Sequence, residues 1–227
     1  MDYSFIIFGL TIISIIITLA SRLFLTNAYN KYMLINNQRN ITGFEAARKI
    51  LDKHNLYDIK IVETKGYQNN NYNPKNKTIK LSSDVYYGKS ITSVCIALHE
   101  CSHAIQDKEK YLPMRIRSKL IPIVNFSTYI GYITILLGCI FGVFNLIYLG
   151  IIVEIIILIF QIITLPTEID ASHRALQELD YSHYFNSKEL KQGKIVLTSA
   201  SLTYVSSLIT TLMQVLKLIF ILRRKEN

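Results

Sequence analysis

The sequence predicts a mainly α-helical, polytopic membrane protein with four transmembrane helices and a smaller polar portion. Half of the 227 residues are hydrophobic, and the mean hydropathy is +0.27, which is high for a water-soluble domain. Four apolar runs are each long enough to cross a bilayer as a helix. The polar segments between them contain an amphipathic stretch and strand-like stretches, so we expect a small α+β portion with a short β-sheet.

The apolar runs divide the chain into five segments. Residues 1–24 are predicted to form an anchor helix, which is retained because no basic stretch precedes its apolar run. Residues 25–119 form the main polar segment, residues 120–165 a hairpin of two spans, and residues 166–199 a second polar segment. Residues 200–227 form the last span and a basic tail.

The main polar segment has recognisable local patterns. Residues 42–53 have the apolar spacing of a short amphipathic helix that places Ile50 and Leu51 on one face. Residues 58–63 alternate apolar and polar side chains, and residues 78–81 have the composition of a strand. The Asn-rich stretch between these two segments is predicted to be a loop.

The charge and the cysteines exclude several classes of protein. The formal net charge is +9, but the basic residues are scattered, whereas a nucleic-acid interface needs a basic stripe with aromatic partners. We therefore expect no nucleic-acid partner and assign the excess charge to contact with the lipid bilayer. The three cysteines, Cys95, Cys101 and Cys139, form no disulfide framework.

The pattern His-Glu-x-x-His is formed by His99, Glu100 and His103. Ser90 is a candidate N-cap for a helix over residues 91–105, which contain neither Gly nor Pro. Helical residues four apart share one face, so the two histidines can bind a single ion while Glu100 acts as general base toward a water. The alternative is an ordinary core helix, in which two histidines and a carboxylate would be costly to bury without a metal.

The spacing of residues leaves several candidates for the third metal ligand. A catalytic zinc ion needs three protein ligands and one position for water. The candidates are His54, His173, His183, Glu168 and Asp170. A glutamate at the start of a second helix, packed against the first, is the arrangement found in zinc peptidases that use two histidines and one glutamate.

The predicted topology is compatible with a shared site. Two spans separate His103 from Glu168, so both residues lie on the same side of the membrane. That side carries nine basic residues near the span ends, whereas the opposite side carries only the basic tail. The positive-inside rule predicts a multi-pass protein of the cell membrane with its catalytic side in the cytoplasm. The nine residues are Arg22, Lys31, Lys108, Lys110, Arg115, Arg117, Lys119, Arg174 and Lys188.

With these motifs the chain resembles the bacterial neutral zinc metallopeptidases of the membrane, the YugP-like proteins, over nearly its whole length. The resemblance rests on Pro74, residues 79–82, Val85, Tyr86, Ser90, residues 99–106, Arg117, Ser118, Pro122, and residues 164–168, 170–172, 174–176, 196–197 and 200–205. It implies that Glu168 is the third zinc ligand. It also implies a zincin-like (gluzincin) catalytic portion, similar to that of the membrane-embedded heat-shock and prenyl-type zinc proteases.

The chain departs from the family pattern at two places. The family tends to have Asp-His-Tyr-Asp-Pro where residues 70–74 read Asn-Asn-Tyr-Asn-Pro, so two acids and a histidine are missing from that loop. Ser102 replaces a glycine that the family usually has before the second histidine of the motif, and either residue is small enough to pack beside a metal.

The sequence and the resemblance together predict a zinc metalloendopeptidase. One Zn²⁺ ion held by His99, His103 and Glu168 would activate a water, with Glu100 as general base. The expected substrates are proteins or peptides, including membrane proteins, in protein quality control. A short strand pair before the motif helix can hold an extended peptide by main-chain hydrogen bonds, or it can only cover the helix.

Three residues close to Glu168 are candidates for supporting roles. Asp170 and Ser172 could each fix the tautomer of a ligand histidine. Arg174 could pair with Asp170 or stabilise negative charge in the reaction, and the pairing is the preferred interpretation.

Two other classes of protein would explain parts of the sequence. A membrane scaffold or chaperone could bind zinc without turnover, but structural zinc sites usually fill all four positions with protein ligands. A transporter could use Glu154 and Lys217 as intramembrane charges, yet this reading leaves the histidine motif unexplained.

Overall fold

The computed structural model describes residues 3–66 and 69–226; the side chains at 132, 139, 144 and 224–226 are outside that description. The end of the predicted basic tail, residues 224–227, therefore lies outside the described side chains. Backbone contacts divide the chain into two compact units. Unit 1 comprises Met1–Arg22, Ile116–Leu165 and Thr203–Asn227, and unit 2 comprises Leu23–Arg115 and Pro166–Leu202.

Helices dominate the chain, with three short strands between the second and third helices. In chain order the elements are α1 (Ser4–Met33), α2 (Gly43–Lys53), β1 (Lys60–Thr64), β2 (Asn71–Asn73), β3 (Thr78–Ser82), α3 (Ser83–Tyr86), α4 (Ile91–Lys108), α5 (Leu112–Phe141), α6 (Phe144–Tyr181) and α7 (Ser187–Glu226). This confirms a mainly α chain with a small sheet.

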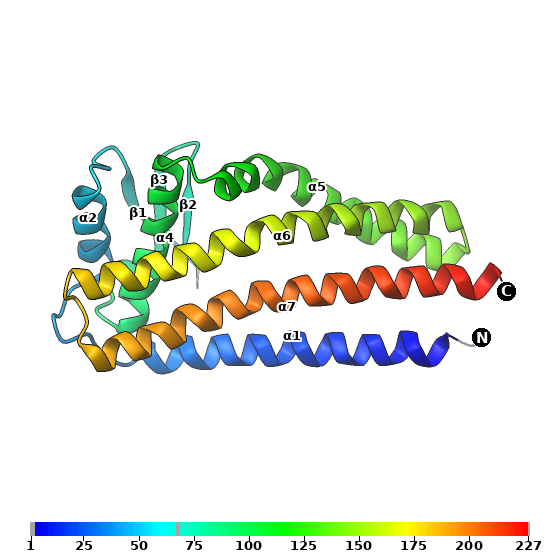
Figure 1. Cartoon of the computed structure of the whole chain (residues 1–227), viewed down its shortest axis with the longest axis horizontal. Helices are drawn as coiled ribbons and strands as arrows, with labels where there is room; N and C mark the ends of the chain where they lie inside the picture. Colours follow the sequence, from blue (N-terminus) through cyan, green and yellow to red (C-terminus); the bar gives the residue numbers. More distant parts are fainter. Residues whose placement is uncertain (1–2, 67–68, 227) are drawn as a thin grey trace. The chain divides into compact units, whose positions relative to one another are not determined.

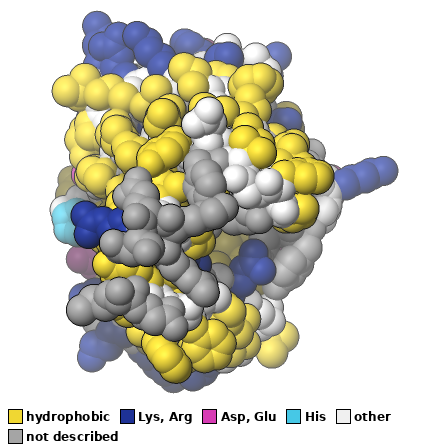
Figure 2. All heavy atoms as spheres, turned by 90° about the vertical axis from the view of Figure 1, so that its right-hand side faces the viewer, with side chains coloured by type: hydrophobic (Ala, Val, Ile, Leu, Met, Phe, Trp, Pro, Cys, Tyr) yellow, Lys and Arg dark blue, Asp and Glu magenta, His cyan; other side chains and the backbone are white. Residues whose placement is uncertain are grey.

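Four of the described helices are long and apolar enough to cross a membrane: Ser4–Met33, Leu112–Gly138, Asn145–Tyr181 and Ser187–Arg223. Each overlaps one of the four predicted apolar runs. Large apolar side chains such as Phe5, Phe126 and Phe141 are exposed. Figure 2, viewed along the longest axis, shows hydrophobic side chains together with several Lys and Arg side chains and few acidic ones. A bilayer is the solvent in which such a surface is stable.

Within unit 1, glycines allow α5 and α6 to pack closely as a hairpin. A Cβ atom added at Gly138 would lie 2.8 Å from Ile147 Cγ1, and one at Gly131 would lie 2.7 Å from Val153 Cγ1. Gly142 turns the chain between the two helices with a positive φ of 66°. Glu154, on the same hairpin, is buried.

In unit 2, α2 and α4 pack against each other and form the centre of the main hydrophobic core. The predicted amphipathic helix is confirmed as α2, which begins at the N-cap Thr42 with a capping box to Glu45. Ile50 and Leu51 are buried on its inner face, as predicted. Gly193 brings α7 close to α4, since a Cβ there would lie 2.8 Å from Cys95 Sγ.

The sheet has three strands in the order β1-β3-β2, and Figure 1 shows it next to α2 and α4. β1 pairs with β3 in parallel, with Lys60 opposite Thr78, whereas β2 is antiparallel to β3. The two predicted strands are confirmed. The prediction that the Asn-rich stretch is a loop is wrong in part, because this stretch contains the edge strand β2.

Two predicted segment boundaries differ from the helices observed. α6 continues through Pro166 without a break, so residues 166–181 of the second polar segment extend the helix of the third span. α5 likewise begins before the predicted span and runs through Pro122. A proline costs a helix one hydrogen bond, which neighbouring packing in an apolar helix can offset.

Candidate metal centre

The helix α4 presents both histidines of the motif on one face. Its N-terminus is fixed by Ser90, whose side chain accepts a hydrogen bond from the backbone N–H of Ser93 at 2.9 Å, as the predicted N-cap requires. His99 and His103 lie one helical turn apart, and their ring centroids are 4.8 Å from each other. His103 is buried and His99 is half-buried.

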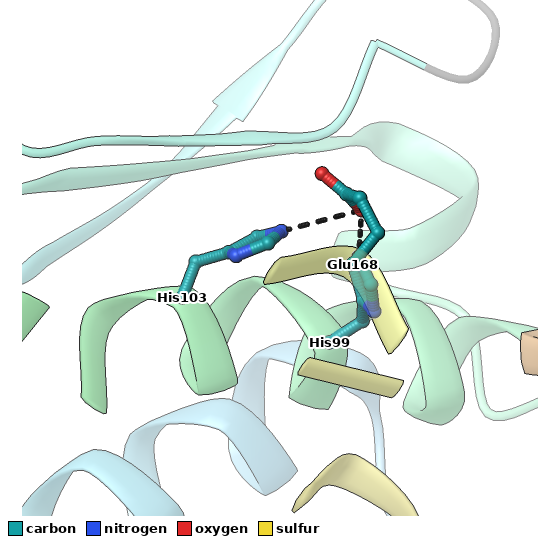
Figure 3. A group of neighbouring side chains, drawn as sticks. All are labelled: His99, His103 and Glu168. Carbon is teal, nitrogen blue, oxygen red and sulfur yellow. Dashed lines mark hydrogen bonds and ion pairs between the residues drawn. The ribbon is translucent and has the colours of Figure 1, made fainter. Parts of the chain in front are cut away.

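The third side chain of the centre comes from α6. Glu168 is 1% exposed, and its Oε2 atom lies 3.2 Å from His99 Nε2 and 3.7 Å from His103 Nε2. Figure 3 shows the carboxylate directed at both rings. Glu168 lies well inside α6, two residues after Pro166, whereas the zinc-peptidase pattern has a glutamate at the start of a second helix.

This group has the dimensions of a zinc site. The possible ligand atoms of His99, His103 and Glu168 all lie within 4.8 Å of one another. Nitrogen and oxygen ligands at about 2.0–2.2 Å from a tetrahedral ion are separated from one another by roughly 3.3–3.6 Å. Side-chain movements of about an ångström would therefore bring all three ligand atoms within bonding distance of one ion. Two imidazoles and a carboxylate are also the ligand types that zinc prefers.

The second ring nitrogens of the two histidines have different partners. His99 Nδ1 lies 3.3 Å from the hydroxyl of Ser172, which is itself 3.2 Å from the hydroxyl of Ser201. His103 Nδ1 lies 2.9 Å from Oε1 of Gln106. Both histidines thus have a hydrogen-bonding group on the side away from Glu168.

Asp170 and Arg174 support the centre from a greater distance. Asp170 Oδ2 accepts hydrogen bonds from Gln106 Nε2 at 2.7 Å and from Arg174 Nε at 2.6 Å. Arg174 also donates to Glu109 Oε2 at 2.7 Å. The preferred pairing of Arg174 with Asp170 is therefore present. Asp170 is linked to His103 through Gln106, a residue to which the sequence alone assigned no role.

Glu100 follows His99 on α4 and is 7% exposed. A carboxylate with so little access to water is costly unless a cation or a hydrogen-bond donor lies near it. Its place directly after His99 in the motif is what makes it the candidate general base.

The other candidate ligands lie elsewhere in unit 2. His54 Nε2 lies 2.8 Å from Glu178 Oε1, so this histidine already has a carboxylate partner. His173 and His183 are exposed. Among the described residues, His99, His103 and Glu168 are the group whose ligand atoms converge.

Cys101 lies within the motif but belongs to the core. Its side chain is buried and its Sγ atom is 3.6 Å from the carbonyl oxygen of Ala47. Burial raises the pKa of the Cys101 thiol well above its usual range. The thiol is thus protonated at neutral pH, which excludes it as a nucleophile.

Residues 6–223 match the model of a protein family described as "Putative neutral zinc metallopeptidase". The chain belongs to this family, as the resemblance in its motifs predicted. It is 37% identical over 201 residues to the "Putative membrane protease YugP" of Bacillus subtilis (strain 168), and the match covers 88% of this chain and 89% of that protein. No solved structure matches the chain.

Proposed function

We propose that the chain is a membrane-integrated zinc metallopeptidase that hydrolyses peptide bonds. The observation that carries this proposal is the convergence of two imidazoles from α4 and one carboxylate from α6 on one small volume. Three protein ligands leave a position for water, which is the difference between catalytic and structural zinc sites. The family description and the name of the Bacillus subtilis relative agree with this reading.

The chemistry follows from the residues. Zinc held by His99, His103 and Glu168 would supply the Lewis acidity that makes water nucleophilic near neutral pH. The Glu100 carboxylate accepts a proton from the attacking water and delivers it to the departing amine. Burial of Glu100 and His103 excludes bulk water, which strengthens each electrostatic interaction in the site.

The edge strand β2 is our candidate for binding the substrate. It pairs on one side only, with β3, so its other edge can form main-chain hydrogen bonds with an extended peptide. The Tyr72 hydroxyl on β2 donates to Asp107 Oδ2 on α4 at 3.0 Å, which ties the strand to the helix that carries the histidines. Burial, together with the nearby Asp107 carboxylate, raises the pKa of Tyr72, so this donor stays protonated.

We place the protein in the cell membrane, with the metal centre on the cytoplasmic side. Four apolar helices support the membrane location, and the concentration of basic residues in the polar segments supports the orientation. Glu168 lies three residues after the apolar run that ends at Leu165. A site so close in the chain to a span favours membrane-associated or misfolded proteins as substrates, and hence protein quality control.

The substitution Glu100→Gln tests the function. We expect the purified full-length variant to retain zinc, because the three ligands are intact, and to lose casein cleavage by about 10²–10⁴-fold. Glu178→Gln is the matched control, since it neutralises a carboxylate on α6 that contacts Lys53 and His54 and not the metal ligands. Cleavage that survives in Glu100→Gln would contradict the mechanism, and zinc-bound protein without any cleavage in the unsubstituted chain would favour a non-catalytic scaffold.

A further inference from the structure

Gln106 is a buried amide whose two ends face different helices. It lies on α4, one turn after His103, and is fully buried. Its Oε1 atom is 2.9 Å from His103 Nδ1. Its Nε2 atom donates to the backbone carbonyl of Thr167 at 2.9 Å and to Asp170 Oδ2 at 2.7 Å, and both of these acceptors are on α6.

The partners of Gln106 determine which way its amide points. A carbonyl oxygen and a carboxylate oxygen can only accept hydrogen bonds, so the amide NH₂ must face Thr167 and Asp170. The amide oxygen must then face His103. An oxygen acceptor at this distance requires a proton on His103 Nδ1, which leaves the lone pair of Nε2 directed toward Glu168 and the proposed metal.

The same side chain also holds the helix that carries the third ligand. Thr167 immediately precedes Glu168, so the hydrogen bond to its carbonyl fixes the backbone next to the carboxylate. Arg174 in turn ties Asp170 to Glu109 at the end of α4, with distances of 2.6 and 2.7 Å. Charge-assisted hydrogen bonds therefore connect Gln106 to Asp170, Asp170 to Arg174, and Arg174 to Glu109, and they link α6 to the end of α4.

We propose that Gln106 is a positioning residue of the metal centre: it sets the tautomer and ring orientation of His103 and fixes the distance between α4 and α6. This inference rests on the proposed function, because it assumes that His103 and Glu168 bind a metal. His99 has a weaker arrangement, since its partner Ser172 has a hydroxyl that can either donate or accept.

The test measures metal binding independently of turnover. Full-length protein carrying Glu100→Gln serves as the parent, and zinc affinity is obtained by competition with a chromophoric chelator. Adding Gln106→Met, which has nearly the same size but no hydrogen-bonding amide, should weaken zinc binding about 10–100-fold, the usual cost of losing a partner of a metal ligand. The visible spectrum of the Co²⁺-substituted protein should shift as well, because the His103 ring is no longer held.

The control is Asn37→Leu in the same parent. Asn37 is an equally buried amide of unit 2 that donates to Ile41 O at 2.8 Å and accepts from Ile41 N at 3.1 Å, without contact to the metal ligands. It should lower stability and leave both the zinc affinity and the Co²⁺ spectrum of the folded protein unchanged. If Gln106→Met does not fold, Gln106→Asn, whose amide is one methylene too short to reach both helices, carries the same expectation.

Two results would overturn the inference while leaving the proposed function in place. One is zinc affinity and a Co²⁺ spectrum in Gln106→Met equal to those of the parent. The other is an equal loss of affinity in Asn37→Leu, which would mean that general destabilisation explains the effect. A parent that binds no zinc at all would overturn the proposed function and this inference together.

Discussion

The substitution Glu168→Gln removes the charge of the third ligand and almost nothing else. Glu168 is 1% exposed, and its Oε2 atom lies 3.2 and 3.7 Å from the two imidazole nitrogens. Glutamine has nearly the same volume, so the packing of α6 on α4 should survive. What is lost is the anionic oxygen, and a neutral amide oxygen is a poor ligand for zinc.

The expected loss of zinc affinity can be estimated from the number of ligands. Structural zinc sites with four protein ligands bind the ion with a free energy of about 10–16 kcal/mol, which is roughly 2.5–4 kcal/mol for each ligand. Because 1.4 kcal/mol corresponds to a factor of ten, replacing one of the three protein ligands should weaken binding about 60- to 700-fold. Cleavage measured at limiting zinc should fall in proportion.

Chelator competition on the purified full-length chain measures this loss directly. Glu178→Gln, a carboxylate on the same helix whose partners are Lys53 and His54, should retain the zinc affinity of the unsubstituted chain. A Glu168→Gln variant that is folded and binds zinc within about threefold of the unsubstituted chain, a difference of less than about 0.7 kcal/mol, would refute the assignment of Glu168 as a ligand.

Two further predictions concern the core of unit 2. Leu51→Ala should destabilise the protein by about 2–5 kcal/mol because it leaves a cavity at a fully buried site, and the melting temperature in detergent should fall by several degrees. The control Leu34→Ala, at an 87% exposed position, should change the melting temperature little. Equal shifts in the two variants would contradict the assignment of Leu51 to the core. Burial raises the pKa of the Cys101 thiol, so at pH 8 it should remain protonated and react with iodoacetamide only after unfolding, and Cys101→Ala should retain cleavage activity. Rapid alkylation of Cys101 in the folded protein would show that this thiol is accessible and ionised.

Local sequence signals predicted the elements whose ends are fixed by their own side chains. Ser90 caps α4, which begins where this residue indicates. α2 begins within one residue of the predicted start at residue 42, and its cap by Thr42 is a feature that the structure adds. The apolar spacing of α2 predicted which of its faces is buried, because the apolar side chains of an amphipathic helix form one stripe that packs against the hydrophobic core. The two histidines of the motif could be placed together because helical periodicity alone sets their separation.

Tertiary contacts decided the features that sequence reasoning missed. β2 consists of Asn-Tyr-Asn, a composition with low strand propensity, and is held by its pairing with β3 and by the bond from Tyr72 to Asp107. The second polar segment was predicted to begin at residue 166, but α6 continues through Pro166 to Tyr181. Gln106 gave one usable signal, its position three residues after His103 on a helix, yet its role depends on Thr167 and Asp170, which are distant in the sequence.

The central claim is that two imidazoles from α4 and one carboxylate from α6 bind a single zinc ion. X-ray absorption at the zinc edge, measured on the purified full-length chain, tests it most directly. The account predicts nitrogen and oxygen ligands at about 2.0–2.2 Å, with the multiple-scattering pattern of two imidazoles and no sulfur at about 2.3 Å. A sulfur ligand, or a spectrum without imidazole scattering, would contradict it.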